Sequence, residues 1–223
     1  MKTIYEQTYQ GLAINTNKEK NQGCYTEILD RLNSQVDIGL SKHSKLIQVR
    51  MDLRYPENES VEPDRSHFSK FNKNMTRVLE RNCLPREEGQ DRGRKRTDSS
   101  GKSKPKHKVD SAITLVVEQH SQDKPPHAHV LVTANGHVHR TPKYIQEQAE
   151  AVWNGVLKRH DEPALVDFCY KNGSSYYLLD KNDSEFEKKM NAASRQRSYL
   201  AKNRGKDLNP EGTWSWMGTR LSR

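Results

Sequence analysis

The spacing of apolar residues along the chain predicts both strands and helices. Apolar side chains recur every three or four residues over 25–32, 68–79 and 142–160, which indicates amphipathic helices. Short apolar runs rich in β-branched and aromatic residues indicate strands at 46–53, 112–118, 164–170 and 175–179, and in a run that opens at His127. A last helix is expected around Tyr199. The pattern favours an α+β domain with an antiparallel sheet of about five strands and covering helices on one face.

Composition suggests three parts of the chain. We expect residues 1–44 to form an N-terminal helical extension, residues 45–206 to form the α+β domain, and residues 207–223 to form a C-terminal tail. From 86 to 108 apolar residues nearly vanish, so a flexible basic insertion is expected there. With 32% hydrophobic residues and a mean hydropathy of −1.07, the 223-residue chain can bury one modest core.

The charge of the chain favours a polyanionic partner. Its formal net charge is +9 and its isoelectric point is near 9.4, so nucleic acid is the obvious candidate. Arg94, Lys95 and Arg96 of the insertion would then contact phosphates without sequence preference. The same composition also fits a solvated loop without a dedicated function, or a nuclear localisation signal.

Cysteine usage and hydropathy indicate a protein of the cytosol. Three cysteines lie far apart and show no CxxC spacing, so neither a disulfide framework nor a zinc ribbon is supported. The first residues contain no apolar leader, and no apolar run is long enough to span a membrane. We therefore expect a cytoplasmic protein without a membrane partner.

Two histidines at the start of a strand are candidate metal ligands. In His127-Ala128-His129 the alternation of a strand sends both imidazoles to one face, where they can hold a divalent ion. Turn-forming residues at 121–126 predict a hairpin that would bring Glu118 close as the third ligand. His120 shares the strand face of Glu118 and is the alternative third ligand. Such triplets are common by chance, and most belong to ordinary strands.

A second triplet, His137-Val138-His139, is a weaker candidate for the metal pair. It follows the turn signal Asn135-Gly136 and leads into a polar helix start at Thr141-Pro142. Because no strand follows it, we expect the first triplet to supply the ligands.

Tyr199 and Lys202 are a candidate nucleophile and its basic partner. At i and i+3 of a helix the phenol and the ammonium lie on one face, so one phosphate can contact both. A phenol with a pKa of about 10 is a poor nucleophile at neutral pH unless cations assist it. Nearby cations would attract a phosphodiester and favour the phenolate, although an ordinary solvated basic face is also possible. They are Arg195, Arg197, Arg204 and Lys206. Lys202 itself could orient the phosphate, lower the tyrosine pKa or assist the leaving oxygen.

The order of these motifs resembles that of the HUH endonucleases. His-x-His opens a strand, and a helix, two strands and a helix with Tyr-x-x-Lys follow. The stretch from Glu118 to His137 is similar to the replication endonucleases of filamentous phages (inoviruses) and to related prophage and plasmid initiators. The resemblance covers residues 45–205. The chain departs from the pattern at Ala128, which is smaller than the usual bulky apolar residue, and in its long basic insertion.

The resemblance implies a ferredoxin-like or RRM-like sheet whose open face binds metal and DNA. It implies Mg²⁺ or Mn²⁺ bound by His127, His129 and Glu118, and Tyr199 as the nucleophile. No second tyrosine lies within a turn of Tyr199, so the chain resembles the single-tyrosine branch. A third histidine, His120, would instead be typical of the relaxase branch.

The implied function is a site-specific single-strand DNA nicking and joining endonuclease. It would initiate rolling-circle replication of a phage, prophage or plasmid through a covalent 5′-phosphotyrosine, while the 3′ hydroxyl primes synthesis. No GxxxxGK[ST] loop occurs, so a host helicase and polymerase would be partners. The alternatives are a non-catalytic nucleic-acid-binding protein, which would tolerate loss of Tyr199, and a relaxase-type mobilisation nickase, which would need His120 more than Glu118.

Overall fold

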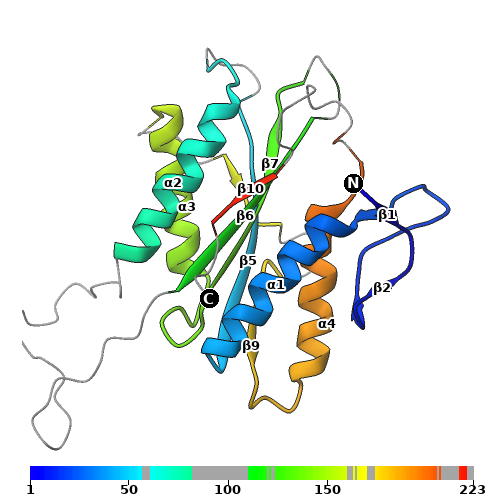
Figure 1. Ribbon diagram of the computed structural model, residues 1–223. Coiled ribbons are helices and arrows are strands. Elements are labelled where there is room, and N and C mark those ends of the chain that lie inside the picture. Colours follow the sequence, from blue (N-terminus) through cyan, green and yellow to red (C-terminus); the bar gives the residue numbers. More distant parts are fainter. Residues whose placement is uncertain are drawn as a thin grey trace, which may run out of the picture.

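A six-stranded antiparallel sheet forms the centre of the protein, and helices lie on both of its faces (Figure 1). The computed structural model describes residues 1–56, 61–81, 110–119, 121, 124–159, 163, 165–169, 174–204, 206 and 216–219. The strands of the sheet are β5 (Lys45–Leu53), β6 (Ser111–Glu118), β7 (His127–Asn135), β8 (Val166–Asp167), β9 (Tyr176–Asp180) and β10 (Trp216–Gly218). Their order is β10-β6-β7-β5-β8, and β9 also pairs with β5. The predicted α+β class with an antiparallel sheet is confirmed.

The central strand β5 separates apolar from polar side chains by its alternation. Its residues Ile47, Val49, Met51 and Leu53 are fully buried and face α2 (Arg65–Arg81) and α3 (Lys143–Leu157). The apolar residues of the predicted helix pattern, Phe68, Phe71, Met75 and Leu79, pack there with Ile145, Ala149, Trp153 and Leu157. This layer is the main core, and it leaves Gln48, Arg50 and Asp52 on the other face of the strand.

Trp153 is the largest side chain of this core. Its ring stacks on Phe68 with 5.5 Å between the ring centroids and 5° between the planes. Its indole N–H donates a 2.9 Å hydrogen bond to the carbonyl of Arg54, which satisfies the one polar atom of the side chain. The core therefore fixes α2 and α3 to one face of β5.

The second face of the sheet is also covered, by α1 (Thr26–Lys42) and α4 (Phe186–Arg197). Leu29 and Leu32 of α1 pack in one cluster with Val116 and Leu131 of the sheet. Apolar residues of α4 form another cluster with α1 and the sheet: Met190 and Ala193 with Val36, Leu40, Leu46 and Leu179. The sequence pattern predicts helices on one face only, because periodicity shows that a helix is amphipathic but not which side of a sheet it covers.

The N-terminal segment, predicted as a helical extension, packs into this second layer. Its short strands pair as β1 (Thr3–Ile4) with β4 (Cys24–Tyr25) and as β2 (Thr8–Tyr9) with β3 (Leu12–Ala13). Ile14 and Cys24 are buried against Leu200 and Ala201, near the other end of the chain. Residues 1–44 therefore contribute to the core.

Several expected segments differ in extent. The strand predicted at 164–170 is reduced to the two residues of β8, and the short leading helix extends over all of α1. The edge strand β10, which pairs with β6, was not predicted. Arg94, Lys95 and Arg96 of the basic insertion lie outside the described residues, as does most of the expected tail. Among the described helices, none has the length and apolar character needed to cross a membrane.

Candidate metal centre and tyrosine site

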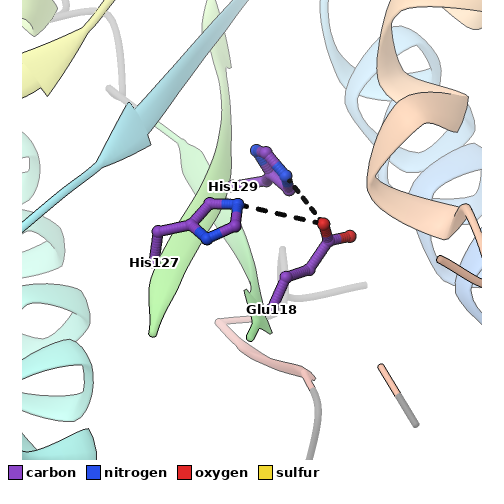
Figure 2. Close-up of side chains that lie close together, drawn as sticks. All are labelled: Glu118, His127 and His129. Carbon is purple, nitrogen blue, oxygen red and sulfur yellow. Dashed lines mark hydrogen bonds and ion pairs between the residues drawn. The ribbon is translucent and has the colours of Figure 1, made fainter. Parts of the chain in front are cut away.

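The hairpin of β6 and β7 brings the three predicted ligands together. In its register Glu118 lies opposite His127 and Val116 lies opposite His129, so all three ligand side chains share a sheet face. Figure 2 shows both imidazoles turned toward the same carboxylate. Oε2 of Glu118 is 3.1 Å from Nε2 of His129 and 3.9 Å from Nε2 of His127. His120, the alternative third ligand, lies outside the described residues.

This donor set fits a divalent metal ion. One ligand atom of each residue lies within 4.8 Å of the other two, and Glu118 and His129 are buried. Adjacent ligands at right angles around an ion with bonds of about 2.1 Å are about 3 Å apart, close to the separation of Glu118 from His129. One carboxylate and two imidazoles also leave further coordination positions for water or substrate. Among the described residues, no other group of three or more His, Cys, Asp or Glu side chains lies close enough to hold a metal ion.

A second carboxylate orients His129. Nδ1 of His129 lies 2.6 Å from Oδ1 of Asp52, which β5 places opposite it in the sheet. Burial alone would lower the pKa of His129, but its hydrogen bonds to Asp52 and Glu118 raise that pKa above the ordinary value. Asp52 is not among the residues that the sequence motifs single out. The available signal was the polar series Gln48, Arg50 and Asp52 at alternate positions of a strand that is otherwise apolar.

Lys206 neutralises Glu118 from the other side. Its ammonium donates a 2.6 Å hydrogen bond to Oε1 of Glu118, and the lysine side chain is only 1% exposed. Burial would raise the pKa of Glu118, but His129 and Lys206 together hold that pKa at about 2. Oε1 is thereby engaged with the lysine, while Oε2 faces the histidines. Lys206, predicted to contact nucleic acid, is instead a buried part of the site.

Tyr199 lies beside these ligands but not on the expected helix. The helix α4 ends at Arg197, a 3₁₀ turn covers Ser198–Ala201, and Lys202 continues with an extended backbone. The Tyr199 ring meets the ring of His129 edge to face, with 5.1 Å between centroids. The ammonium of Lys202 is 4.8 Å from the centre of the Tyr199 ring. The structure therefore brings tyrosine, lysine and ligands together through a turn, because the helix stops before the motif.

The surroundings of Tyr199 keep its phenol protonated. Burial raises the pKa of Tyr199, and this effect outweighs the opposing charge of Arg50. The guanidinium of Arg50 lies 3.9 Å from the ring centroid, as a cation over an aromatic face. The cations near Tyr199 in the sequence predict a stabilised phenolate, but the loss of hydration around the half-buried phenol outweighs their charge.

Two segments of the N-terminal region hold the turn that carries Tyr199. The backbone N–H of Asn203 donates to the carbonyl of Gly23 at 3.0 Å, and the N–H of Gly23 donates to Oδ1 of Asn203 at 3.1 Å. Cys24 forms an isolated β-bridge with Lys202. The N–H of Asn15 donates to Oγ of Ser198 at 2.8 Å. The turn is thus fixed from both ends by residues at the start of the chain.

Residues 7–213 match the family model of the YagK/YfjJ C-terminal domain. The chain belongs to this family. The matched region includes α1, the ligand hairpin and the Tyr199 turn, which agrees with their packing into one domain. No curated protein matches the chain.

The predicted basic residues of this YagK/YfjJ-family domain have different positions. Arg195 and Arg204 are exposed beside Tyr199, where a nucleic acid could reach them. Arg197 is 1% exposed, and its guanidinium donates two hydrogen bonds, of 3.1 and 3.0 Å, to Oδ1 of Asn33 in α1. Burial lowers the pKa of Arg197 to about 10. Arg197, predicted to contact nucleic acid, therefore joins α4 to α1 inside the protein.

The second histidine triplet has a structural role elsewhere. His137 forms a 2.9 Å hydrogen bond with the hydroxyl of Ser44, and His139 is buried and stacks on Tyr144. Both lie beyond the end of β7, whereas His127 begins this strand. The expectation that the first triplet supplies the ligands agrees with this geometry.

Tyr199 and Lys202 line two hollows of the family domain. The larger has a volume of about 430 Å³ and is also lined by Arg50, Tyr177, Arg195 and Gln196. The smaller, of about 170 Å³, is also lined by Gln22, Glu118 and Arg204. Both hollows therefore border Tyr199 and Lys202.

Proposed function

We propose that this YagK/YfjJ-family domain is a metal-dependent HUH-type endonuclease that nicks and joins single-stranded DNA at a specific site. By this chemistry it starts rolling-circle replication of a phage, prophage or plasmid. The observation that carries the proposal is the position of Tyr199, whose ring lies 5.1 Å from the ring of His129 in the Glu118, His127 and His129 group. A nucleophile beside a divalent-ion site, in a basic protein, fits transfer of a phosphodiester.

Glu118, His127 and His129 would hold the ion, which we propose is Mg²⁺ or Mn²⁺. When bound, the ion neutralises charge on a non-bridging phosphate oxygen and makes the phosphorus more electrophilic. Asp52 accepts a hydrogen bond from Nδ1 of His129 and would keep the proton on that nitrogen, while Nε2, which lies 3.1 Å from Glu118, would give up its proton when it binds the ion. Lys206 holds Oε1 of Glu118, which leaves Oε2 on the side of the histidines.

In the proposed reaction the phenolic oxygen of Tyr199 attacks the phosphorus. A bond forms between this oxygen and phosphorus, and the bond from phosphorus to the 3′ oxygen breaks. The phenol loses its proton and the 3′ oxygen gains one, so that a 5′-phosphotyrosine and a free 3′ hydroxyl result. Lys202, whose ammonium lies beside the ring, can contact the phosphate or give a proton to the leaving oxygen. Attack of a 3′ hydroxyl on the phosphotyrosine reverses the reaction and joins strands.

The proposed reaction implies further partners. The protein would act in the bacterial cytosol on origin DNA presented as a single strand. A host helicase would unwind the template and a host polymerase would extend the 3′ hydroxyl. Arg195 and Arg204, both exposed beside Tyr199, would contact the strand.

Trapping the covalent intermediate tests the proposal. Wild type and the Tyr199→Phe variant are incubated with a labelled single-stranded oligonucleotide pool and Mg²⁺ or Mn²⁺, and a denaturing gel is scored for protein-DNA adducts. We expect a metal-dependent adduct with wild type and none with Tyr199→Phe. Tyr144→Phe is the matched control, because Tyr144 lies on α3, on the opposite face of the sheet, and should be dispensable for the adduct. Absence of any adduct or cleavage with wild type, despite DNA binding, would refute the enzyme.

One observation favours a second candidate, a non-catalytic nucleic-acid-binding protein. Glu118 is already paired with Lys206, and the phenol of Tyr199 is held protonated, so the site is satisfied electrostatically by protein groups. Such a binder would keep its affinity for DNA in EDTA and after His129→Ala, and would form no adduct. The relaxase-type alternative depends on His120, which lies outside the described residues.

A further inference from the structure

The wall of the larger hollow beside Tyr199 is positively charged. Three cationic side chains, Arg50, Arg195 and Lys202, contribute to its wall, and no Asp or Glu of the described residues does so. Its other polar side chains are uncharged ones: Asn15, Cys169, Ser174, Tyr177, Gln196 and Tyr199. A pocket of this composition favours an anion over a neutral or cationic ligand.

Arg50 is the buried cation of this hollow. The residue is only 5% exposed, because β5 is central in the sheet and α4 lies over this face. Its Nη2 is 3.5 Å from Oδ1 of Asp52, which is longer than a charged hydrogen bond, and that same oxygen already accepts a 2.6 Å hydrogen bond from His129. Within the described part of the chain, Nε of Arg50 has no hydrogen-bond partner. Buried guanidinium groups are normally paired, so this one has unused donor capacity.

The position of Arg50 connects the hollow to the tyrosine. Its guanidinium lies 3.9 Å from the centroid of the Tyr199 ring, and Tyr199 also lines the smaller hollow together with the candidate ligand Glu118. A single strand with its reacting phosphate at Tyr199 would therefore place a neighbouring nucleotide in the larger hollow. The planar guanidinium of an arginine can donate two parallel hydrogen bonds to the oxygens of one phosphate.

We propose that the larger hollow is a binding site for a phosphodiester of single-stranded DNA next to the reacting one, with Arg50 as its buried anchor. Arg195 and Lys202 complete the anion site at its rim. The site rests on the proposed function for the identity of its ligand, but it acts in binding and needs no metal and no nucleophile. Arg50 is thus a positioning residue that fixes the strand relative to Tyr199.

Salt-dependent DNA binding tests this site independently of the reaction. All proteins carry Tyr199→Phe and are titrated in EDTA, by fluorescence anisotropy, with a labelled single-stranded oligonucleotide of mixed sequence over a range of salt concentrations. Loss of one phosphate contact should reduce the slope of log affinity against log salt by about 0.7. We expect this change of slope in Arg50→Met. We also expect roughly a tenfold loss of affinity, because the free energy of a hydrogen bond to a charged group corresponds to about a tenfold change in a binding constant. Arg50→Lys should recover part of the affinity because it keeps the charge.

Arg77→Met is the matched control, because Arg77 is exposed on α2, on the opposite face of the sheet. The proposal would be overturned if Arg50→Met and Arg77→Met changed the slope of log affinity against log salt equally. It would also be overturned if Arg50→Met left this slope unchanged. Should Arg50→Met fail to fold, the exposed Arg195→Met replaces it and must show the same reduced slope. Displacement of the oligonucleotide by low millimolar inorganic phosphate would also overturn the proposal, because the hollow would then select free phosphate.

The two proposals can fail separately. A normal adduct in wild type with an unchanged slope in Arg50→Met retains the endonuclease and rejects the phosphate site. A reduced slope in Arg50→Met without any adduct in wild type retains the phosphate site and rejects the endonuclease.

Discussion

Replacing Lys206 by Met tests the electrostatic design of the candidate metal centre. The side chains of Lys206 and Glu118 are 1% and 4% exposed, and their charged atoms are 2.6 Å apart. Removal of one partner from a buried ion pair typically costs about 3–5 kcal/mol, since it leaves the other charge without its counterion. His129 remains as a partner of Glu118, so we expect Lys206→Met to lower the free energy of unfolding by about 3 kcal/mol.

The pKa of Glu118 gives a second measure of the same interaction. Its partners lower this pKa from 4.5 to about 2. At about 1.4 kcal/mol for each pH unit, the ionised carboxylate contributes about 3 kcal/mol of stability at neutral pH. Because the folded-state pKa is depressed, this stability is present above pH 4.5 and is lost as the pH falls toward 2. Glu118→Gln should therefore remove both the stability and its pH dependence in this window.

A double-mutant cycle separates the contribution of Lys206 from that of His129. Urea unfolding of wild type, Lys206→Met, Glu118→Gln and the double variant is measured at pH 7 in EDTA. We expect a coupling energy of about 1–3 kcal/mol between the two residues. Lys189→Met is the control, because Lys189 forms an ion pair with Asp183 at the surface and should change stability little. A coupling below about 0.5 kcal/mol would refute the buried pair.

Three further predictions concern the metal and the core. Mn²⁺ at one hundred times its dissociation constant should stabilise the wild type by about 2.7 kcal/mol in thermal unfolding, and His129→Ala should abolish this shift. Asp52→Asn should weaken Mn²⁺ binding about 10–100-fold by calorimetry, whereas Asp167→Asn, an exposed change on β8, should not; equal losses would contradict the role of Asp52. Trp153→Ala should cost about 3–5 kcal/mol in urea unfolding, and a cost below about 1 kcal/mol would contradict its stacking in the core.

The ligand hairpin could be predicted from the sequence because its information is local. Only eight residues separate β6 from β7, so the register that sets Glu118 opposite His127 follows from a short connection and the strand pattern. The helices α2 and α3 were likewise indicated by their own apolar spacing. In each case neighbouring residues determine which side chains meet.

The remaining parts of the site depend on contacts between distant segments. Asp52 meets His129 across 77 residues, through the pairing of β5 with β7, and no local pattern contains this pairing. The basic residues near Tyr199 show the same limit. Arg195 is exposed, Arg197 binds Asn33 inside the protein, and Lys206 binds Glu118, although composition alone makes the three equivalent. The three residues differ in burial, which depends on how α1 and the sheet pack around each of them.

The hydrogen bonds between Gly23 and Asn203 have a consequence for the order of folding. They close a separation of 180 residues, whereas Glu118 and His127, which pair in the hairpin, are only nine residues apart in the chain. Long-range contacts bear a larger loss of chain entropy and form late, so the ligand hairpin can form before the Tyr199 turn is fixed. In native-state hydrogen exchange, amides of the Tyr199 turn should open at lower free energy than those of the hairpin. Tyr199 would then be the last component of the candidate site to reach its place.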